Sequence, residues 1–429
     1  MIFQTTREVL QSADEGDIVR LRGWVYRKRE FKDKIFIMLR DGEGVIQLVF
    51  SGPLAEDARK LNIESSIMIE GIVKIEPRAP GGKEVHVSRI LWSYVGEPFP
   101  INVSAAQADS EYLLDVRHLW IRSRKMWAML RIRHTVFNAI HEYFRMNGFY
   151  EVQCPIFVSA AVEGGATLFP VKYFDRTVYL TQSAQFYLEA LIFSLEKVYT
   201  VAPSFRAEPS RTRRHLTEFW HAEAEMAWSN MYDVMKVSEE LICHIVRRVL
   251  DERVEELSIL GRDVEKLERV RPPFPRVLYD EAIEILKRKG LNVEWGSDLG
   301  ADEERILMQE FETPIHLYGF PEQIKAFYHK NDPQDPKRTL SVDVLAPEGY
   351  GEIIGGGERI EDPNQLIEKI KRFGLNPKDY EWYIDLRRYG SVPHAGFGLG
   401  VDRLVMWICG LDHIRDAIPF PRDIRRVTP

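Results

Sequence analysis

The stretch that most constrains the fold of this chain runs from Ser204 to Trp228 and reads SFRAEPSRTRRHLTEFWHAEAEMAW. Alternating apolar residues at 198–205 and 218–228 predict two β-strands joined by a long charged loop. Because successive side chains of a strand point to opposite faces, Glu223 and Glu225 share a face of the return strand. A solvated hairpin also carries charge, but four arginines, two histidines and four glutamates in one hairpin indicate a binding site.

A chain of 429 residues exceeds what one hydrophobic core usually serves, so we expect two or more domains. The net charge of −7 argues against indiscriminate coating of nucleic acid, yet it leaves room for basic patches at 27–29 and 211–214. The N-terminus lacks a signal-peptide pattern and no apolar run approaches membrane-spanning length, which predicts a cytoplasmic protein. The widely spaced Cys154, Cys243 and Cys409 indicate core residues, not a disulfide framework or a cysteine-bound metal.

Residues 18–95 read as short β-strands separated by glycine-containing turns at 41–44 and 79–82. A short helix is predicted at 54–61, between the third and fourth strands. This is the layout of an OB-fold barrel, whose open face binds single-stranded nucleic acid, although a purely structural barrel is an alternative. The five predicted strands lie at 18–26, 34–40, 45–50, 66–75 and 84–90.

The rest of the chain mixes helices with strands. Residues 97–109 are polar and broken by prolines, which is typical of a linker. An apolar repeat predicts a helix over 124–147, then a strand ending at Pro155, and 394–400 form a glycine-rich strand that leads into a helix. Further strands are predicted at 314–320, 325–328 and 340–345. The chain is thus predicted to be α+β, with domains at 1–97 and 119–429 and a linker or hinge at 98–118.

Three of these signals together resemble motifs 1, 2 and 3 of the class II aminoacyl-tRNA synthetases. They are the helix and strand ending at Pro155, the hairpin that carries Arg206, and the glycine-alternating strand before a helix with Arg403. With an N-terminal OB-fold barrel of five strands, the chain is similar to subclass IIb, the aspartyl, asparaginyl and lysyl enzymes. The resemblance implies a catalytic domain with a mixed, mainly antiparallel sheet flanked by helices, and a homodimer joined through motif 1.

Amino-acid activation by ATP builds charge at the α-phosphate, which preorganised cations must meet. The resemblance implies that Arg206 clamps the α-phosphate and Arg403 the γ-phosphate, as the two catalytic cations, while Glu208 accepts from the adenine amino group and Phe219 stacks on its ring. No protein nucleophile is needed, because the substrate carboxylate attacks. The implied ATP-binding residues are Arg206, Glu208, Arg214, His215, Phe219, Glu352, Gly400 and Arg403.

Polyphosphate binding calls for Mg²⁺ held by carboxylates, and the family position implies Asp343 and Glu352 as its ligands. Their spacing is two residues longer than the usual aspartyl pattern, which weakens Asp343 more than Glu352. Gly355 also stands where the family often has a serine. A pair of solvated loop carboxylates is the alternative.

The amino-acid substrate depends on a few positions. Arg359 matches the arginine that holds the side-chain oxygen in both aspartyl and asparaginyl enzymes, and Leu188 replaces a lysine of the aspartyl enzymes. Glu223 stands where those enzymes have aspartate, so a carboxylate can accept the amide hydrogens of asparagine and repel aspartate. Glu358 and Asp402 depart from the usual asparaginyl pattern. The implied amino-acid site comprises Glu163, Ser183, Gln185, Glu223, Arg359 and Gly396, the first three for the α-amino group.

In the barrel, Phe36 and Gln47 fall on adjoining predicted strands, as in the aspartyl and asparaginyl anticodon readers. The resemblance implies that Phe36 stacks on the central anticodon uridine, that Gln47 hydrogen-bonds it, and that Arg29 reaches a neighbouring base or phosphate. A core aromatic is the alternative for Phe36. Asparagine and aspartate anticodons share that uridine, so these residues do not separate the two tRNAs.

The favoured function is activation of L-asparagine with ATP and transfer of asparaginyl to the terminal adenosine of tRNA. An aspartyl-tRNA synthetase, including one that also charges the asparagine tRNA, is disfavoured by Leu188 and Glu223. An asparagine synthetase on the same catalytic domain has no use for the predicted barrel. A non-enzymatic tRNA-binding paralogue should have lost Arg206 or Arg403, and both are present.

Overall fold

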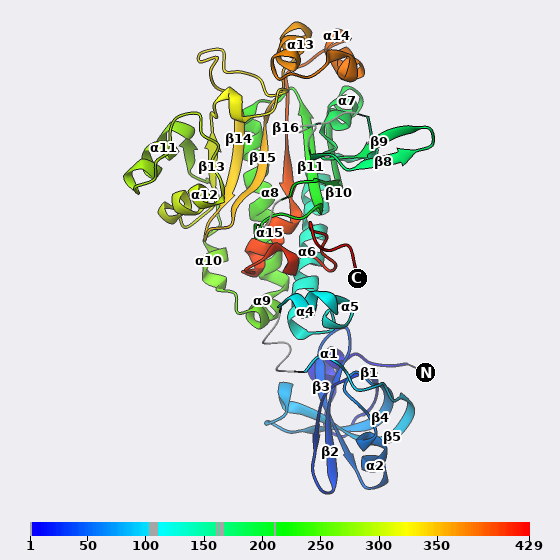
Figure 1. Cartoon of the computed structure of the whole chain (residues 1–429). Helices are drawn as coiled ribbons and strands as arrows, with labels where there is room; N and C mark the ends of the chain where they lie inside the picture. The colour runs from blue at the N-terminus through cyan, green and yellow to red at the C-terminus, as the bar shows by residue number, and fades with distance from the viewer. Residues whose placement is uncertain (1, 103–109, 160–161, 163–166, 210–211) are drawn as a thin grey trace. The chain divides into compact units, whose positions relative to one another are not determined.

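The computed structural model describes residues 2–102, 110–159, 162, 167–209 and 212–429. The chain divides into two compact units, Met1–Leu113 and Leu114–Pro429 (Figure 1). The division falls within the segment 98–118. In the described part of the chain, no helix is long and apolar enough to cross a membrane.

The first unit is a closed five-stranded barrel with strand order β1-β2-β3-β5-β4, which confirms the predicted OB-fold. Alternate residues of each strand fill its core, among them Leu21, Ile37 and Leu48. The register between β1 and β2 shifts between Val25 and Arg27, and such irregularities bend strands as barrel closure requires. Its elements are α1 Thr6–Ser12, β1 Ile18–Glu30, β2 Lys34–Arg40, β3 Val45–Ser51, α2 Pro53–Arg59, β4 Ser66–Ile75 and β5 Lys83–Tyr94.

The second unit is built on an eight-stranded sheet with the order β12-β13-β14-β15-β16-β11-β10-β6. The β12–β13 and β10–β6 pairs are parallel and the other pairs are antiparallel, which confirms the predicted mixed sheet. The strands are β6 Tyr150–Glu151, β10 Lys197–Phe205, β11 Glu218–Ala227, β12 Arg276–Leu278, β13 Ile315–Tyr318, β14 Ser341–Ala346, β15 Gly351–Glu358 and β16 His394–Gly400. A small sheet joins β7 Phe157–Val158, β8 Pro170–Tyr173 and β9 Arg176–Leu180.

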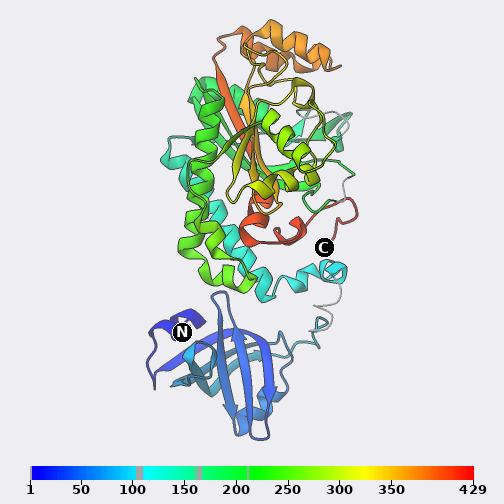
Figure 2. The ribbon, with the colours of Figure 1, turned by 90° about the vertical axis from the view of Figure 1, so that its left-hand side faces the viewer.

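Two long helices, α6 Arg124–Met146 and α8 Met231–Glu252, run along this sheet (Figure 2). Ser123 caps α6 by accepting from the Met126 amide, and Asn230 with Asp233 forms a capping box at α8. Their apolar faces share one core with alternate residues of β11 and β16. The intervening residues of these two strands therefore point to the opposite face, which is where the predicted site residues lie.

Helix α4 Ser110–Asp115 spans the boundary between the two units. The remaining helices of the second unit surround its sheet or lie beyond its ends (Figure 1). They are α5 Arg117–Trp120, α7 Gln185–Leu195, α9 Val254–Leu260, α10 Val264–Glu268, α11 Tyr279–Arg288, α12 Ala301–Leu307, α13 Pro363–Arg372, α14 Glu381–Arg388 and α15 Val401–Cys409. The predicted strand at 325–328 is wrong, because this segment follows a 3₁₀ helix at Glu322–Ile324 and consists of a bend and a turn. The strand predicted up to Pro155 is confined to Tyr150–Glu151.

Candidate active site

Strands β11 and β16 place carboxylates opposite glycines on the face away from α6 and α8. Glu223 pairs with Gly398 in register, and Glu225 pairs with Gly396. A Cβ at Gly396 would lie 2.0 Å from Glu225 Oε2 and 2.4 Å from the carbonyl oxygen of Ala224. Only glycine leaves room for the Glu225 carboxylate here.

One cavity gathers all the residues that were predicted to bind ATP. Arg206 follows β10, Phe219 lies on β11, Glu352 on β15, and Arg403 in the first turn of α15. The guanidinium of Arg206 lies 5.5 Å from the centre of the Phe219 ring. The predicted ATP residues that line this cavity, hereafter the ATP cavity, are Arg206, Glu208, Arg214, His215, Phe219, Glu352, Gly400 and Arg403.

Ion pairs hold two cations of the ATP cavity, Arg214 and Arg403, in place. Nη1 of Arg403 donates to the Glu352 carbonyl oxygen at 3.0 Å and lies 3.4 Å from its Oε2, while Arg214 pairs with the Glu304 carboxylate. Burial raises the pKa of Glu352, but the surrounding cations, Arg403 foremost, outweigh it and bring that pKa to about 2. The cavity therefore presents fixed guanidinium groups and an ionised carboxylate.

The two histidines of the ATP cavity are uncharged at neutral pH. Burial lowers the pKa of His215 to about 4 and that of His221 to about 3, and the nearby guanidinium groups of Arg206 and Arg403 add to both shifts. His221 Nδ1 lies 3.1 Å from the Ser204 hydroxyl oxygen. His215 thus offers a phosphate a neutral hydrogen-bonding ring, and the positive charge comes from the arginines.

A second cavity of ≈ 560 Å³, hereafter the amino-acid cavity, adjoins the first. Arg206, His221, Glu352 and Gly398 line both. Of the predicted amino-acid residues, Ser183, Gln185, Glu223 and Arg359 line this cavity. Gly396 instead backs onto Glu225, and Glu163 lies outside the described residues.

Glu223 is anchored at the floor of the amino-acid cavity, with 4% of its surface exposed. The Ser183 hydroxyl donates to its Oε1 and the Ala184 amide donates to its Oε2 at 2.8 Å. Leu188, which replaces a lysine of the aspartyl pattern, also lines the cavity and is 1% exposed. An apolar side chain thus stands where that pattern has a cation.

Arg359 enters the same cavity as one half of a buried ion pair. Its Nε and Nη2 each donate to a different oxygen of Glu225 at 3.1 Å. The Cζ atom of Arg359 lies 5.3 Å from the centre of the Tyr328 ring. Its Nη1 is buried and has no hydrogen-bond partner among the described residues. A buried donor without a partner is costly, so Nη1 is suited to bind a ligand oxygen.

Carboxylates outnumber cations around the amino-acid cavity. Among the described lining residues there are three cations and five carboxylates. The cations are Arg206, Lys325 and Arg359, and the carboxylates are Glu223, Glu225, Asp298, Asp343 and Glu352. A further anionic group in this cavity meets net repulsion, which a neutral group of the same shape does not.

The two predicted magnesium ligands differ in their surroundings. Nζ of Lys325 lies 2.8 and 2.6 Å from the two oxygens of Asp343. Burial raises the pKa of Asp343, so the Lys325 ammonium is needed to keep it ionised. The Lys325 ammonium thus occupies both oxygens of Asp343, which makes this carboxylate a poor metal ligand. Glu352 fits a metal better, because it faces the ATP cavity and its nearest cation, Arg403, lies 3.4 Å from one oxygen only. Gly355 beside Glu352 supplies no hydroxyl to a metal.

Sequence reasoning missed several residues of the amino-acid cavity. Lys325 was read as part of a strand, and Asp298, Gln323, Tyr328 and His329 were not singled out, yet all line the cavity. They come from turns and irregular segments, where no periodic pattern reports which way a side chain points. In the segment 325–328, the charge of Lys325 was the one sequence feature that could have indicated a binding residue.

In the barrel, the predicted anticodon residues share the outer face of β1, β2 and β3. Arg29 pairs with Phe36 in register, while Gln47 pairs with Met38, so Phe36 and Gln47 are diagonal neighbours. Phe36 is half-buried and lies outside the barrel core, which removes the core-aromatic alternative. Nε2 of Gln47 donates to Glu84 at 2.7 Å.

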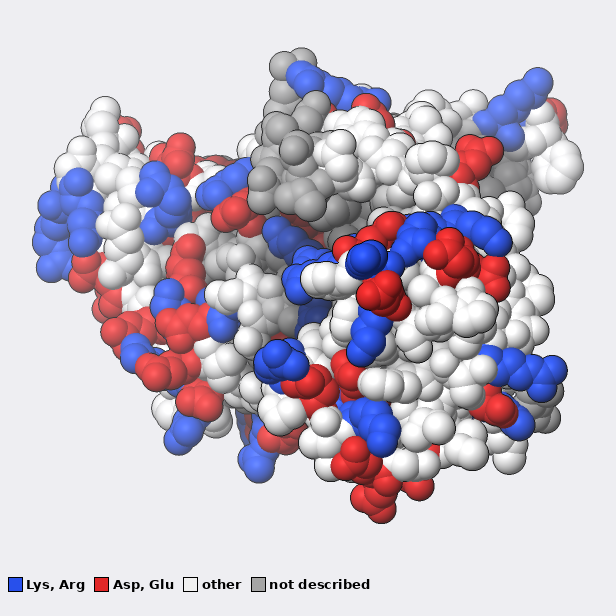
Figure 3. All heavy atoms as spheres, turned by 90° about the horizontal axis from the view of Figure 1, so that it is seen from below, with Lys and Arg blue, Asp and Glu red and all other residues white. Residues whose placement is uncertain are grey.

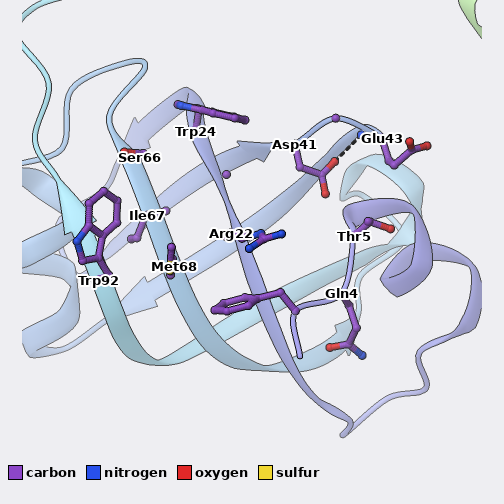
Figure 4. Close-up of a pocket in the computed structure, with 13 residues that line it drawn as sticks. Gln4, Thr5, Arg22, Trp24, Asp41, Glu43, Ser66, Ile67, Met68 and Trp92 are labelled. Carbon is purple, nitrogen blue, oxygen red and sulfur yellow. Dashed lines mark hydrogen bonds between the residues drawn. The ribbon is translucent and has the colours of Figure 1, made fainter. Parts of the chain in front are cut away.

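The barrel also carries a hollow of ≈ 460 Å³ on another part of its outer surface (Figure 4). Arg22 and Trp24 of β1 line it together with Met68 of β4 and Trp92 of β5. It lies over the first half of β1, whereas Arg29 belongs to the second half.

On the face of the molecule shown in Figure 3, Lys and Arg side chains are interspersed with Asp and Glu side chains. This distribution agrees with binding through local geometry instead of a broad basic field.

Comparison with known proteins matches the two units to two families. The class II tRNA synthetases (D, K and N) match residues 109–424, and the OB-fold nucleic acid binding domain matches residues 19–91. The chain therefore belongs to the class II tRNA synthetases of the D, K and N group, as the sequence motifs predicted.

Within that family, similar proteins include several asparagine–tRNA ligases. The asparagine–tRNA ligase of Thermococcus gammatolerans is 55% identical over 419 residues, which cover 97% of each chain. That of Pyrococcus abyssi is 54% identical over the full length of both. The crystal structure of asparaginyl-tRNA synthetase from Pyrococcus horikoshii complexed with asparaginyl-adenylate matches with a TM-score of 0.97 and 53% identity over 100% of both chains.

Proposed function

We propose that this chain is a ligase that activates L-asparagine with ATP and transfers the asparaginyl group to the 3′-terminal adenosine of tRNA. The observation that carries the proposal is the pair of adjoining cavities, one rich in arginine and one with excess carboxylates. The similarity to asparagine–tRNA ligases at 54–55% identity supports it. So does the likeness to the asparaginyl-adenylate complex.

In the first step the asparagine carboxylate attacks the α-phosphorus of ATP and pyrophosphate leaves. Arg206, which lines both cavities, would hold the α-phosphate as charge grows there, and Arg403 would hold the γ-phosphate. Glu208 would accept from the adenine amino group, and the Phe219 ring would stack on the base. The terminal hydroxyl of tRNA then attacks the adenylate carbonyl carbon and AMP leaves.

Magnesium in this reaction would neutralise phosphate charge and orient the leaving group. Glu352 would hold it, because carboxylates commonly bind Mg²⁺ in nucleotide sites. Lys325 keeps the Asp343 carboxylate occupied. We therefore propose that Asp343 binds no magnesium and instead holds Lys325 in the amino-acid cavity.

Selection of asparagine over aspartate follows from charge and hydrogen bonding. The anchored Glu223 carboxylate would accept from the side-chain amide, and Nη1 of Arg359 would donate to the amide oxygen. Aspartate places a second negative charge in a cavity already rich in carboxylates. Ser183, Gln185 and Glu163 are proposed to hold the α-amino group.

The barrel would read the tRNA anticodon. Phe36 would stack on the central uridine, Gln47 would hydrogen-bond that base, and Arg29 would reach a neighbouring base or phosphate. All three lie on one outer face of the barrel. Stacking on an aromatic side chain contributes about 1–3 kcal/mol per base.

We further propose a homodimer formed through α6 and the adjoining strand, acting in the cytoplasm. The sequence resemblance to motif 1 supports this assembly. Gel filtration with light scattering should give twice the chain mass of 50.0 kDa. A monomer at micromolar concentration would refute the dimer and leave the activity unaffected.

The deciding experiment is ATP–pyrophosphate exchange with asparagine and with aspartate in parallel. We expect exchange with asparagine and at least tenfold less with aspartate at equal concentration. Exchange with aspartate alone would replace the proposal by an aspartyl enzyme. Formation of asparagine from aspartate and ammonia would instead identify an asparagine synthetase.

A further inference from the structure

A buried ion cluster lies behind the amino-acid cavity without lining it. The cluster consists of Glu189 from α7, Tyr383 and Arg387 from α14, and His394 at the start of β16, and each is at most 3% exposed. The Tyr383 hydroxyl lies 2.8 Å from both oxygens of Glu189, His394 Nε2 lies 2.9 Å from Oε2, and Arg387 forms an ion pair with it. Such complete pairing is what a fully buried carboxylate requires.

The cluster already contains cationic groups and does not need a metal. Ligand atoms of Glu189, Glu225 and His394 lie within 4.8 Å of one another, a spacing that a cation could share. Guanidinium groups already take this role, since Arg387 pairs with Glu189 and Arg359 pairs with Glu225. Burial raises the pKa of Glu189, but Arg387 and His394 outweigh it and lower that pKa, so Glu189 is ionised.

The first link from the cluster to the substrate runs through Gln185, which lines the amino-acid cavity. Its Nε2 lies 2.9 Å from Glu189 Oε1. An ionised carboxylate only accepts hydrogen bonds, so the Gln185 amide must turn its NH₂ group toward Glu189. The Gln185 carbonyl oxygen is thereby left as the group that can accept from a substrate ammonium.

The second link runs through the segment that carries Arg359. The Arg359 amide donates to the His394 carbonyl oxygen at 3.0 Å, and Nε of Arg387 donates to the Ile360 carbonyl oxygen at 2.9 Å. The guanidinium itself is held by Glu225. A long arginine side chain has several rotamers, and fixing both its backbone and its head leaves Nη1 in one place.

We propose that Glu189 is a positioning residue for asparagine binding, a role that rests on the activity proposed above. It turns the Gln185 carbonyl oxygen toward the α-ammonium of the substrate. Through Arg387 and His394 it fixes the segment whose Arg359 Nη1 meets the side-chain amide oxygen. One buried carboxylate thus sets the donor and the acceptor at the two ends of the substrate.

Glu189→Gln tests this role, because glutamine keeps the shape and loses the charge. We expect the KM for asparagine in pyrophosphate exchange to rise about 10- to 100-fold, and the KM for ATP to stay within about twofold, since the cluster does not reach the ATP cavity. Glu256→Gln is the matched control, because Glu256 is 1% exposed and paired with Arg131 at 2.6 Å on α6. It should change neither KM.

A second variant separates positioning from folding. Glu189→Gln leaves Arg387 buried without its counter-ion, whereas Glu189→Gln combined with Arg387→Met removes both charges of that ion pair. We expect the double variant to regain thermal stability and to keep the raised KM for asparagine. Recovery of both stability and KM would show that Glu189 only supports the fold.

Other outcomes are equally decisive. Parallel rises in the KM values for asparagine and ATP, or an unchanged asparagine KM in folded Glu189→Gln, would overturn the positioning role. These results leave the proposed function intact as long as the wild-type chain exchanges with asparagine. Absence of that exchange in the wild type would instead remove the proposed function.

Discussion

The two units hold their candidate ligand-binding residues in opposite ways. In the barrel, Arg29 is exposed and Phe36 is a half-buried side chain outside the core, with Phe31 as a ring neighbour at 5.5 Å. In the second unit, Glu223 and Arg359 are 4% and 2% exposed and are tied into buried hydrogen bonds and ion pairs. The barrel site is therefore separable from its fold, whereas the catalytic site is part of the core.

The chemistry of each task explains the difference. An unstacked base can approach a rigid outer surface and needs an aromatic face and a few polar groups there. Adenylyl transfer needs charges that are already oriented and shielded from water, which a buried network provides. Substitutions in the barrel should hence affect tRNA alone, while substitutions in the second unit should affect activity and stability together.

The largest expected effect comes from Arg206→Ala. Arg206 lines both cavities, so its loss removes the cation that bridges the two substrates. We expect pyrophosphate exchange to fall by about 10²–10³-fold or more, as removal of a preorganised donor commonly does. The exposed Arg176 on β9 gives a control, and Arg176→Ala should exchange at the wild-type rate. Exchange within tenfold of wild type in Arg206→Ala would contradict the assigned role.

Sequence alone predicted the parts of the molecule that follow a period or a motif. The barrel strands, α6 and the β10–β11 hairpin were predicted because their apolar spacing indicates one buried face. Most of the residues predicted to bind ATP come from motifs 2 and 3, and the structure brings all of them into one cavity. The pairing of Glu225 with Arg359 was not predicted, since it joins residues 134 positions apart.

Other features were missed for the same physical reason. Lys325 lies in a turn whose direction depends on packing against Phe320 and on its pair with Asp343. The Glu189 cluster combines residues of α7, α14 and β16, and no local sequence pattern indicates that these elements are in contact. Long-range ion pairs are set by the tertiary fold, whereas periodicity reports only local structure.

The next largest effect is expected from Glu223→Gln, which tests whether the carboxylate itself selects the substrate. The amide cannot accept from both Ser183 and Ala184 and no longer repels an anion. We expect kcat/KM for asparagine to fall about 10²-fold, the asparagine-to-aspartate ratio to fall with it, and the KM for ATP to stay within about threefold. An unchanged ratio would assign discrimination to another residue.

A smaller effect concerns acid stability and should be confined to the second unit. Burial lowers the pKa of the 1%-exposed His316 to about 4, below its unfolded value of 6.5. Its stabilising contribution is complete above pH 6.5 and is lost as the pH falls toward 4, because the unfolded state binds the proton first. At pH 5 the free energy of unfolding is therefore lower by about 2 kcal/mol than at neutral pH. The barrel's single histidine, His86, has a side chain that is 43% exposed.

Hydrogen–deuterium exchange of the full chain at pH 7 and pH 5 checks this, with peptides assigned to each unit. We expect the second unit to lose protection at pH 5 more than the barrel does. His316→Asn should reduce that difference, whereas His134→Asn, at an exposed position of α6, should not. Equal loss of protection in both units would show that the buried imidazole does not set the acid limit.

The smallest expected effect, and the sharpest test of separability, is Phe36→Ala. Losing one stacked base costs about 1–3 kcal/mol, so we expect the KM for tRNA in aminoacylation to rise about tenfold. Pyrophosphate exchange and the unfolding midpoint should not change, because Phe36 lies outside the barrel core. Trp92→Ala, another half-exposed aromatic of the barrel, should leave aminoacylation unchanged. A loss of exchange that matched the loss of aminoacylation would mean that the barrel and the catalytic site are not separable.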